Sequence, residues 1–413
     1  MSKKIIRRVA NSYGAIKQDI INTPLEINKR LSSLYNTNIY YKREDLQITR
    51  SFKLRGSLNK IKKIKENTNG LICASAGNHA QGFAYSCNKL NLNGTIYVPQ
   101  ITPSQKLNRI RYYGKDNITI KLYGNNFQEC LDKAVNESNE TKQCFVHPFD
   151  DYDIINGQAT IAYEIYKNQI PDFIICPVGG GGLISGISQY SKIINPNCII
   201  IGVEPENANS LTLAIQNNKP TLIENIDTFV DGASVPIIGN KTFEISRDNV
   251  DKIYTISKGK ICHDIINCYQ DDGIILEPAG ALPISCLDYL KQDYNLNGKN
   301  VVIIVSGGNN DVTRYNEIMK LNLEYMGLVH YFVIEFNQVP NQLRQFINNI
   351  LDENSDIIRF EYIKKTNSMY GNVLIGIQLS NKNKLDILLE KLNNHNIKYN
   401  KIEQDDLYYD ILI

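Results

Sequence analysis

The feature that most constrains the fold is a series of short apolar runs, each closed by glycine or polar residues and followed by a helix-like segment. The runs cover residues 70–74, 93–99, 173–178, 199–204 and 301–305. Unbroken apolar strands that alternate with helices are typical of parallel sheets covered on both faces. Such sheets bind ligands at the carboxyl ends of their strands. We therefore predict an α/β chain whose functional residues follow directly after the strands.

The alternating pattern of strands and helices changes near Met326 and Gly327. A chain of 413 residues is also too long for one ordinary domain. Strand-like and helix-like segments then follow in the order β-α-β-β-α, at 329–336, 341–351, 357–364, 372–379 and 384–392. This order predicts a small split βαβ module of ferredoxin type. We predict one domain at 1–320 and a second at 326–413, with a short junction because no low-complexity linker is present.

Charge and composition exclude several classes of partner. The chain has 45 basic and 43 acidic residues, so its net charge of +2 gives no electrostatic reason to expect nucleic acid or membrane as a partner. Residues 1–8 are basic without a following apolar core, which is unlike a secretory signal. The nine cysteines are irregularly spaced and form no Cys-x-x-Cys, so we expect mostly buried thiols in a reducing cytoplasm.

A single lysine, Lys53, stands in the segment Ser-Phe-Lys-Leu-Arg-Gly at 51–56. A catalytic lysine needs partly apolar surroundings that lower its pKa and make the free amine available. Phe52 and Leu54 would supply those surroundings. The alternative is an ordinary surface lysine at the start of a helix.

Two further segments have the character of anion-binding loops. Residues 75–82, Ser-Ala-Gly-Asn-His-Ala-Gln-Gly, join an apolar strand to a helix-like segment at 83–90, where successive backbone N–H groups can bind an anion. The glycines 179–182 likewise precede a helix that begins near Leu183. They match neither a Walker loop nor Gly-x-Gly-x-x-Gly. The alternatives are a helix cap with a packed histidine for Asn78 and His79, and a plain turn for the glycines.

Taken together with Ser306-Gly307-Gly308-Asn309, these motifs resemble the fold-type II pyridoxal phosphate enzymes, which share a tryptophan synthase β-like fold. The resemblance is greatest to the biosynthetic threonine dehydratases and covers essentially the whole chain. It implies that Lys53 holds the cofactor covalently and takes the α-proton of the substrate. The implied cofactor contacts are Phe52, Lys53, Asn78, Gly179, Gly180, Gly181, Gly182, Leu183 and Ser306. The implied substrate contacts are Ser75, Gly77, Asn78 and His79.

The identity of Ser306 bears on the type of reaction. The resemblance places its hydroxyl at the ring nitrogen of the cofactor, where a carboxylate would hold the nitrogen protonated and make a stronger electron sink. A neutral serine gives a milder sink, which suits β-elimination of a hydroxyl and suits transamination poorly. This inference from chemistry agrees with the resemblance.

The resemblance also implies secondary sites. Glu204, Ala208 and Ser210 match a cation site, where oxygen ligands suit a monovalent or divalent cation such as potassium, calcium or magnesium; the alternative is a solvated loop glutamate. The segment 277–281 is expected near the cofactor and 231–234 against its ring. Residues 327–332 and 359–365 resemble the ACT-like regulatory domain of short-form threonine dehydratases.

The function implied is deamination of L-threonine, and also of L-serine, in the cytoplasm. Water is eliminated and 2-oxobutanoate and ammonia are released, as the first step of isoleucine biosynthesis. The ACT-like domain implies an allosteric effector, isoleucine or valine, and the family implies a homotetramer. The alternatives are a serine dehydratase, a racemase or a threonine synthase relative on the same fold, and a non-catalytic amino-acid sensor.

Overall fold

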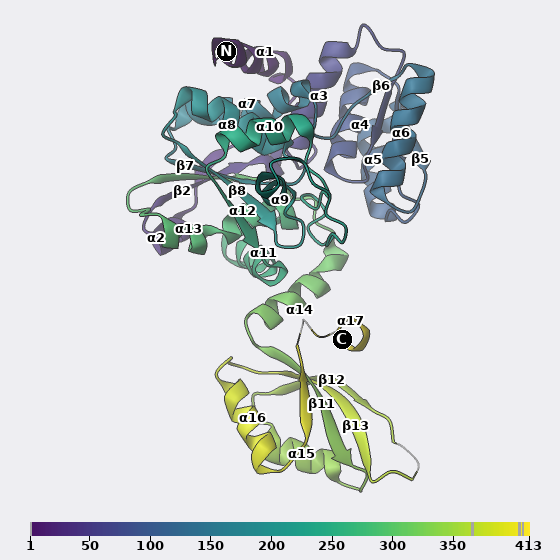
Figure 1. Ribbon diagram of the computed structural model, residues 1–413, viewed down its shortest axis with the longest axis vertical. Coiled ribbons are helices and arrows are strands. Elements are labelled where there is room, and N and C mark those ends of the chain that lie inside the picture. Colours follow the sequence, from purple (N-terminus) through teal and green to yellow (C-terminus); the bar gives the residue numbers. More distant parts are fainter. Residues whose placement is uncertain (1, 365–366, 404–405, 407–408) are drawn as a thin grey trace. The chain divides into compact units, whose positions relative to one another are not determined.

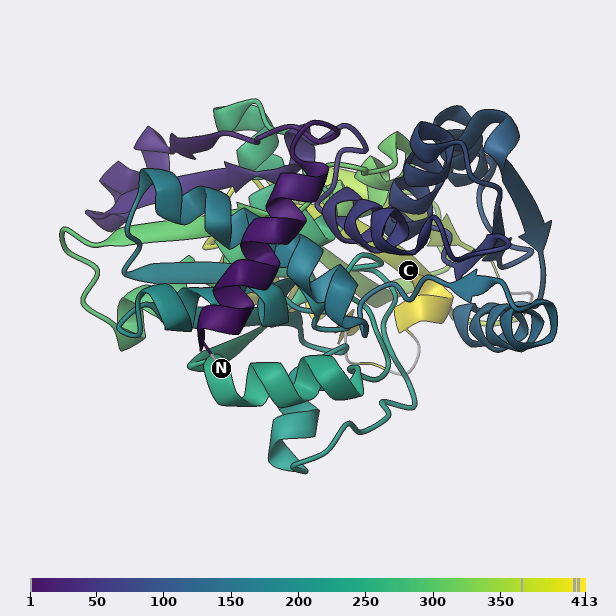
Figure 2. The same ribbon diagram turned by 90° about the horizontal axis from the view of Figure 1, so that it is seen from above.

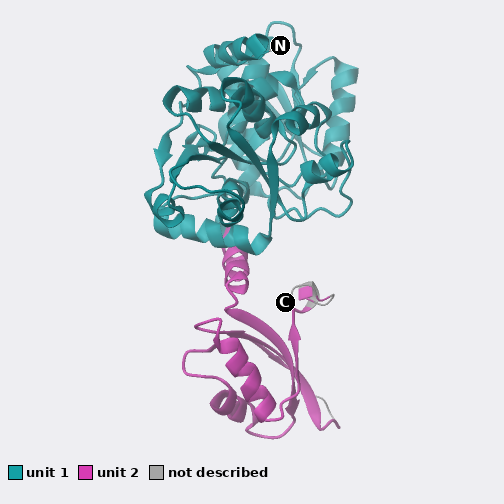
Figure 3. Cartoon of the chain, turned by 60° about the vertical axis from the view of Figure 1, so that its left-hand side comes forward, with its two compact units in different colours: residues 1–312 teal, residues 313–413 magenta. Residues whose placement is uncertain are grey.

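The structure is a computed structural model that describes residues 2–364, 367–403, 406 and 409–413. It divides into two compact units, Met1–Val312 and Thr313–Ile413 (Figure 3). Lys365, the last residue of the regulatory motif at 359–365, lies outside the described residues. Each unit is described by itself.

The first unit contains two sheets. The larger has the strand order β1-β2-β10-β7-β8-β9, in which only the edge pair β1–β2 is antiparallel. Its strands are β1 (Leu25–Ile27), β2 (Asn38–Arg43), β7 (Phe173–Pro177), β8 (Ile199–Pro205), β9 (Lys252–Ile256) and β10 (Asn300–Val305). Strands β7 and β10 are buried along nearly their whole length, because helices cover both faces of the sheet.

The helices of this layer lie on the two sides of the larger sheet (Figure 1). Helices α7, α8 and α10 lie on one side, and α11, α12 and α13 on the other. The bounds in this part of the chain are α1 (Ser2–Ile16), α2 (Lys29–Tyr35), α7 (Tyr152–Asn168), α8 (Gly182–Ile194), α9 (Ser210–Gln216), α10 (Asn240–Asn249), α11 (Lys258–Asp272), α12 (Pro278–Ser285) and α13 (Leu287–Asp293).

The smaller sheet is wholly parallel and has the order β5-β4-β3-β6. Alternate side chains of its strands point to opposite faces: Leu71 and Cys73 pack toward α4, while Ile72 and Ala74 pack toward α6. The elements are β3 (Leu71–Ala74), β4 (Gly94–Val98), β5 (Ile118–Leu122), β6 (Cys144–Phe145), α3 (Lys53–Ile64), α4 (Asn78–Leu90), α5 (Ser104–Gly114) and α6 (Phe127–Thr141), with 3₁₀ turns at Glu44–Leu46 and Lys115–Asn117.

The second unit is a four-stranded antiparallel sheet with the order β12-β13-β11-β14, and α15 and α16 pack on one face through a shared apolar core. Its elements are α14 (Tyr315–Tyr325), β11 (Val329–Asn337), α15 (Gln342–Ile350), β12 (Asp356–Tyr362), β13 (Tyr370–Gln378), α16 (Lys384–Asn394), β14 (Tyr399–Ile402) and α17 (Tyr409–Leu412), with a 3₁₀ turn at Val312–Arg314. The ferredoxin-type order predicted from the sequence is confirmed, with β14 as an additional strand.

The apolar runs did not predict strands β1, β2, β5, β6 and β9 of the first unit, nor two features of its helices. Residues 2–16 form α1, whose buried Val9 and Ile16 pack along α7 and α3 and which crosses the other helices in the view from above (Figure 2). The helix-like segment expected from residue 83 begins earlier, at Asn78, because the loop residues themselves form the first turn.

The burial of most thiols agrees with the expectation drawn from composition. All nine cysteines are free, and all but Cys144 are buried. None of the helices in the described residues is both long and apolar enough to cross a membrane.

Candidate active site

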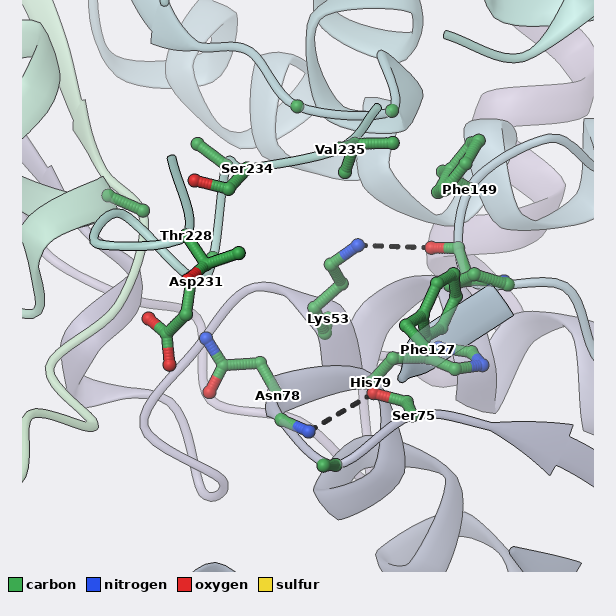
Figure 4. A pocket seen from close by; sticks show the side chains of 18 of the residues that line it. Lys53, Ser75, Asn78, His79, Phe127, Phe149, Thr228, Asp231, Ser234 and Val235 are labelled. Carbon is green, nitrogen blue, oxygen red and sulfur yellow. Dashed lines mark hydrogen bonds between the residues drawn. The ribbon is translucent and has the colours of Figure 1, made fainter. Parts of the chain in front are cut away.

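A cavity of about 660 Å³ opens where strands β3, β7 and β10 end. The structure brings into its wall every cofactor and substrate residue expected from the sequence: Phe52, Lys53, Ser75, Gly77, Asn78, His79, Gly179, Gly180, Gly181, Gly182, Leu183 and Ser306. Figure 4 shows Lys53 in the middle of this cavity. Residues separated by more than 250 positions in sequence thus share one site.

Lys53 is the first residue of α3, and its position is fixed by the strand that ends beside it. The Phe52 amide donates a hydrogen bond to the Ser306 carbonyl oxygen (3.1 Å), and Ser51 forms a single antiparallel bridge with Gly307. These contacts hold Lys53 beside Ser306. The expectation for Leu54 needs correction, because successive helical residues point in different directions and Leu54 packs into the core with Ile16.

The amine of Lys53 has the electrostatics expected of a reactive lysine. Burial lowers its pKa to about 8, and the nearby carboxylate of Glu277 opposes that shift. Its Nζ donates a hydrogen bond to the carbonyl oxygen of Pro148 (3.1 Å). The amine is therefore partly neutral near physiological pH, as proton abstraction requires.

The loop before α4 places polar groups on the opposite side of the cavity. The Gly77 amide donates a hydrogen bond to Ser75 Oγ (3.2 Å), drawn in Figure 4. The first amides of a helix have no partner within the helix, so this turn can receive a carboxylate. His79 Nε2 donates to the Val146 carbonyl oxygen (3.0 Å), and burial lowers the pKa of His79 to about 3. Its imidazole is thus neutral and already engaged by the backbone.

Asn78 is held at both ends of its amide. Its Nδ2 donates to the two carboxylate oxygens of Glu277 (2.8 and 2.9 Å), and its Oδ1 accepts from Asn309 Nδ2 (2.7 Å). Glu277 is buried in the cavity wall, and burial raises its pKa to about 7. The sequence placed the segment 277–281 near the cofactor, mainly as part of the architecture, and did not single out Glu277. The signal that could have identified Glu277 is a carboxylate directly before a proline and two small residues.

The glycine run forms a cradle that side chains would fill. A Cβ on Gly180 would lie 2.3 Å from the ring of Phe149, and Gly181 has the left-handed φ of 85°. The Gly180 carbonyl accepts from Thr242 Oγ1 (2.7 Å). Helix α8 begins at Gly182, and its free first-turn amides and dipole favour a phosphate here.

The hydroxyl of Ser306 shows whether the site can accept the ring of pyridoxal phosphate. This side chain is only 1% exposed, and its Oγ has no hydrogen-bond partner among the described residues. A buried polar group without a partner is destabilising unless a ligand satisfies it. The unsatisfied hydroxyl, the glycine cradle and Lys53 together fit pyridoxal phosphate.

The residues of the expected cation site lie outside this cavity wall. Glu204 is fully buried at the end of β8, and its carboxylate accepts from the amides of Leu211 and Thr212 (2.7 and 2.9 Å) and from Thr212 Oγ1 (2.6 Å). It serves as a cap for α9, so a cation would compete with three donors. Ala208 and Ser210 are buried beside it. Within the part of the chain that the structure describes, no group of three or more His, Cys, Asp or Glu side chains is placed to hold a metal ion.

Comparison with known proteins agrees with this geometry. A family model described as pyridoxal-phosphate dependent enzyme matches residues 16–307, well over half of the chain. The chain therefore belongs to the pyridoxal-phosphate dependent enzymes. A second model, described as the C-terminal regulatory domain of threonine dehydratase, matches residues 321–412.

Full-length relatives define the group more narrowly. The protein named L-threonine dehydratase biosynthetic IlvA from Halalkalibacterium halodurans is 41% identical over 418 residues and covers 100% of both chains. That of Bacillus subtilis is 42% identical over 412 residues, covering 99% of this chain and 97% of its own. The solved threonine deaminase isoform 2 from Solanum lycopersicum is 35% identical with a TM-score of 0.73, covering 78% of this chain and 94% of its own. Within the pyridoxal-phosphate dependent enzymes, the chain belongs to the biosynthetic L-threonine dehydratases.

Proposed function

We propose that this protein deaminates L-threonine as the first step of isoleucine biosynthesis: water is eliminated to give an enamine, which takes up water again and yields 2-oxobutanoate and ammonia. One observation carries the proposal: a buried lysine with a lowered pKa faces a glycine cradle and an unpartnered serine hydroxyl in a single cavity. These are the groups that a pyridoxal phosphate enzyme needs for the amine, the phosphate and the ring.

When bound, pyridoxal phosphate draws electron density from the α-carbon of an amino acid and makes its α-proton acidic. We assign the other tasks to the residues of the chain. The Lys53 amine accepts the α-proton, and the first turn of α4 binds the substrate carboxylate through backbone N–H groups. Ser306 Oγ meets the ring nitrogen as a neutral partner, which favours elimination over transamination.

The proposal is tested by comparing product release from L-threonine and from L-serine by the purified full chain. Replacing Lys53 by Ala removes the amine, so we expect the absorbance of the covalently bound cofactor and the turnover to be lost together. Lys63→Ala is the matched control, because Lys63 lies in the same helix and pairs with Asp153 (2.7 Å) at the surface. Retention of both signals in Lys53→Ala would refute the assignment of this lysine.

We further propose that the second unit binds isoleucine or valine and biases the catalytic unit between two states. The match to the regulatory domain of threonine dehydratase supports effector binding in general. Steady-state kinetics with L-threonine, with and without each amino acid, test this assignment. Kinetics that neither amino acid changes would contradict it.

Cytoplasmic location and a homotetramer complete the proposal. The nine free cysteines suit a reducing compartment. The molar mass by light scattering tests the tetramer, since one chain has a mass of 46.9 kDa. A mass of a single chain at working concentration would contradict it.

A further inference from the structure

The turn at Val146–Asp150 connects parts of the active site that are distant in sequence. The Val146 carbonyl accepts from His79, and the Pro148 carbonyl accepts from Lys53. Phe149 lines the cavity, and its ring fills the space that a side chain on Gly180 would need. Figure 4 shows Phe149 and the hydrogen bond from Lys53 on the same side of the cavity. The turn at 146–150 therefore contacts the segment 75–82, Lys53 and the glycines 179–182.

The side chain of His147 holds this turn from within. Its Nδ1 accepts from the amides of Phe149 (3.2 Å) and Asp150 (2.8 Å), so this nitrogen carries no proton. Burial lowers the pKa of His147 to about 4, which keeps the ring neutral. The imidazole also packs edge-on against the Phe149 ring, with centroids 4.7 Å apart. The direction of the intervening Pro148 carbonyl is set by these contacts.

Asp150 fixes the other end of the turn. Its Oδ1 accepts from the amides of Lys241 (2.8 Å) and Thr242 (3.1 Å) at the start of α10. Thr242 in turn donates to the carbonyl of Gly180. The turn and the glycine cradle are therefore held by the same helix, which makes the position of the Pro148 carbonyl rigid relative to the cofactor site.

We propose that the Pro148 carbonyl is the acceptor that orients the amine of Lys53 whenever this amine is free, and that His147 is a positioning residue that acts through this carbonyl. Lys53 must be released from the cofactor when the substrate takes its place, and the flexible side chain then needs a fixed partner. Lys53 and Pro148 both line the cavity, so an amine held by this carbonyl stays at the cavity wall.

The contribution of the Pro148 contact to the pKa of Lys53 can be measured, because few other groups around the amine are charged. Of the titratable groups near the amine, Glu277 raises its pKa, whereas His79 and His147 are neutral near pH 7. A carbonyl acceptor bonds more strongly to an ammonium than to an amine, so loss of the Pro148 contact would lower the pKa of Lys53. This shift has a sign that a general loss of stability would not produce.

The test uses the full chain freed of cofactor and then mixed with pyridoxal phosphate at a series of pH values. Only the neutral amine attacks the aldehyde, with release of water, so the rate at which the covalent absorbance appears reports the titration of Lys53. We expect a midpoint near 8 for the unmodified protein. His147→Leu should lower the midpoint by about one pH unit. It should also lower kcat for L-threonine by about 10- to 100-fold with a much smaller change in KM.

His147→Asn restores an acceptor oxygen near the position of Nδ1, so its midpoint should return toward that of the unmodified protein. His395→Leu, at an exposed site in the second unit, is the matched control and should change neither value. An unchanged midpoint in His147→Leu, or equal shifts in the Leu and Asn variants, would overturn the inference. If the Leu variant does not fold, a crystal structure of the cofactor-free protein decides: Lys53 Nζ bonded to Pro148 supports the inference, and any other position overturns it.

The inference rests on the proposed function, because Lys53 is released only during turnover. The two can fail separately, since cofactor attachment is measured without an amino acid. Normal attachment with no threonine turnover would count against the function. Normal turnover with an unshifted midpoint would count against the role of Pro148 and His147.

Discussion

Replacing Arg55 by Leu should destabilise the catalytic unit strongly, because Arg55 is the centre of a buried network of four charges. Its guanidinium is fully buried and bonds Glu44 (2.8 and 2.9 Å) and Glu164 (2.8 and 2.8 Å). Lys42 completes the network, because its Nζ donates a hydrogen bond to Glu164 Oε2 (2.6 Å). The two cations and two carboxylates balance, and Thr23 supplies further hydrogen bonds.

The magnitude follows from what the substitution leaves behind. Without Arg55, two buried carboxylates share the single cation of Lys42, so one negative charge has no buried partner. Breaking a buried ion pair in this way costs about 3–5 kcal/mol in the free energy of unfolding. Burial by itself would raise the pKa of Glu44, but the charges of Arg55 and Lys42 and the hydrogen bonds from Arg55 and Thr23 lower it. Because the stabilisation from a lowered carboxyl pKa is lost as pH falls through the folded-state pKa, the difference between the proteins should shrink in acid.

Urea unfolding of the cofactor-free proteins, followed by circular dichroism, measures this difference without linkage to cofactor binding. Tryptophan fluorescence is not an option because the chain contains no tryptophan. Arg247→Leu is the matched control, since Arg247 pairs with Asp248 at the surface and both side chains are well exposed. We expect that control to lie within about 0.5 kcal/mol of the unmodified protein. A cost for Arg55→Leu no greater than for Arg247→Leu would refute the reasoning.

Two further predictions concern the cavity wall. Gly180→Ala should place a methyl group against the Phe149 ring, and such overpacking costs about 1–3 kcal/mol. If this cost falls on the cofactor-bound state, pyridoxal phosphate binding measured by titration should weaken by about 5- to 150-fold. Gly14→Ala is the control and should leave binding unchanged, because Gly14 has open space around it. Glu277→Gln should remove a pH dependence: the raised folded-state pKa of Glu277 gives stability that is present below about pH 4.5 and lost as pH rises through about 7. In urea unfolding of the cofactor-free proteins, the free energy of unfolding of the unmodified chain should fall by up to about 3 kcal/mol relative to that of Glu277→Gln as pH rises over that range. Parallel pH profiles of the two proteins would contradict this.

Much of the fold could be predicted because the strands carry their own signal. The runs at 173–178 and 301–305 correspond to β7 and β10 within one residue at each end, since strands covered on both faces must be continuously apolar. The second unit follows the predicted order for a similar reason. Strand β14 was missed because a four-residue edge strand with mixed side chains has no distinctive period.

Some residues of the candidate site could likewise be predicted from the sequence, and others could not. Lys53, Asn78, the glycines 179–182 and Ser306 could be named from the sequence because each stands in a local motif at the end of a strand or the start of a helix. The contacts of Pro148 and His147 could not be named, because a backbone carbonyl has no sequence signature. The role of Arg55 as the centre of a charged network also depended on partners 11 and 109 positions away.

The sequence by itself determined which segments become strands, helices and anion-binding turns, because hydrophobic period and glycine act over a few residues. Only the tertiary structure decided the chemistry of the ionisable groups. Lys53 has a lowered pKa and Glu277 a raised one because folding removes both from water. Desolvation depends on everything that surrounds a side chain, and those surroundings come from segments that the sequence keeps far apart.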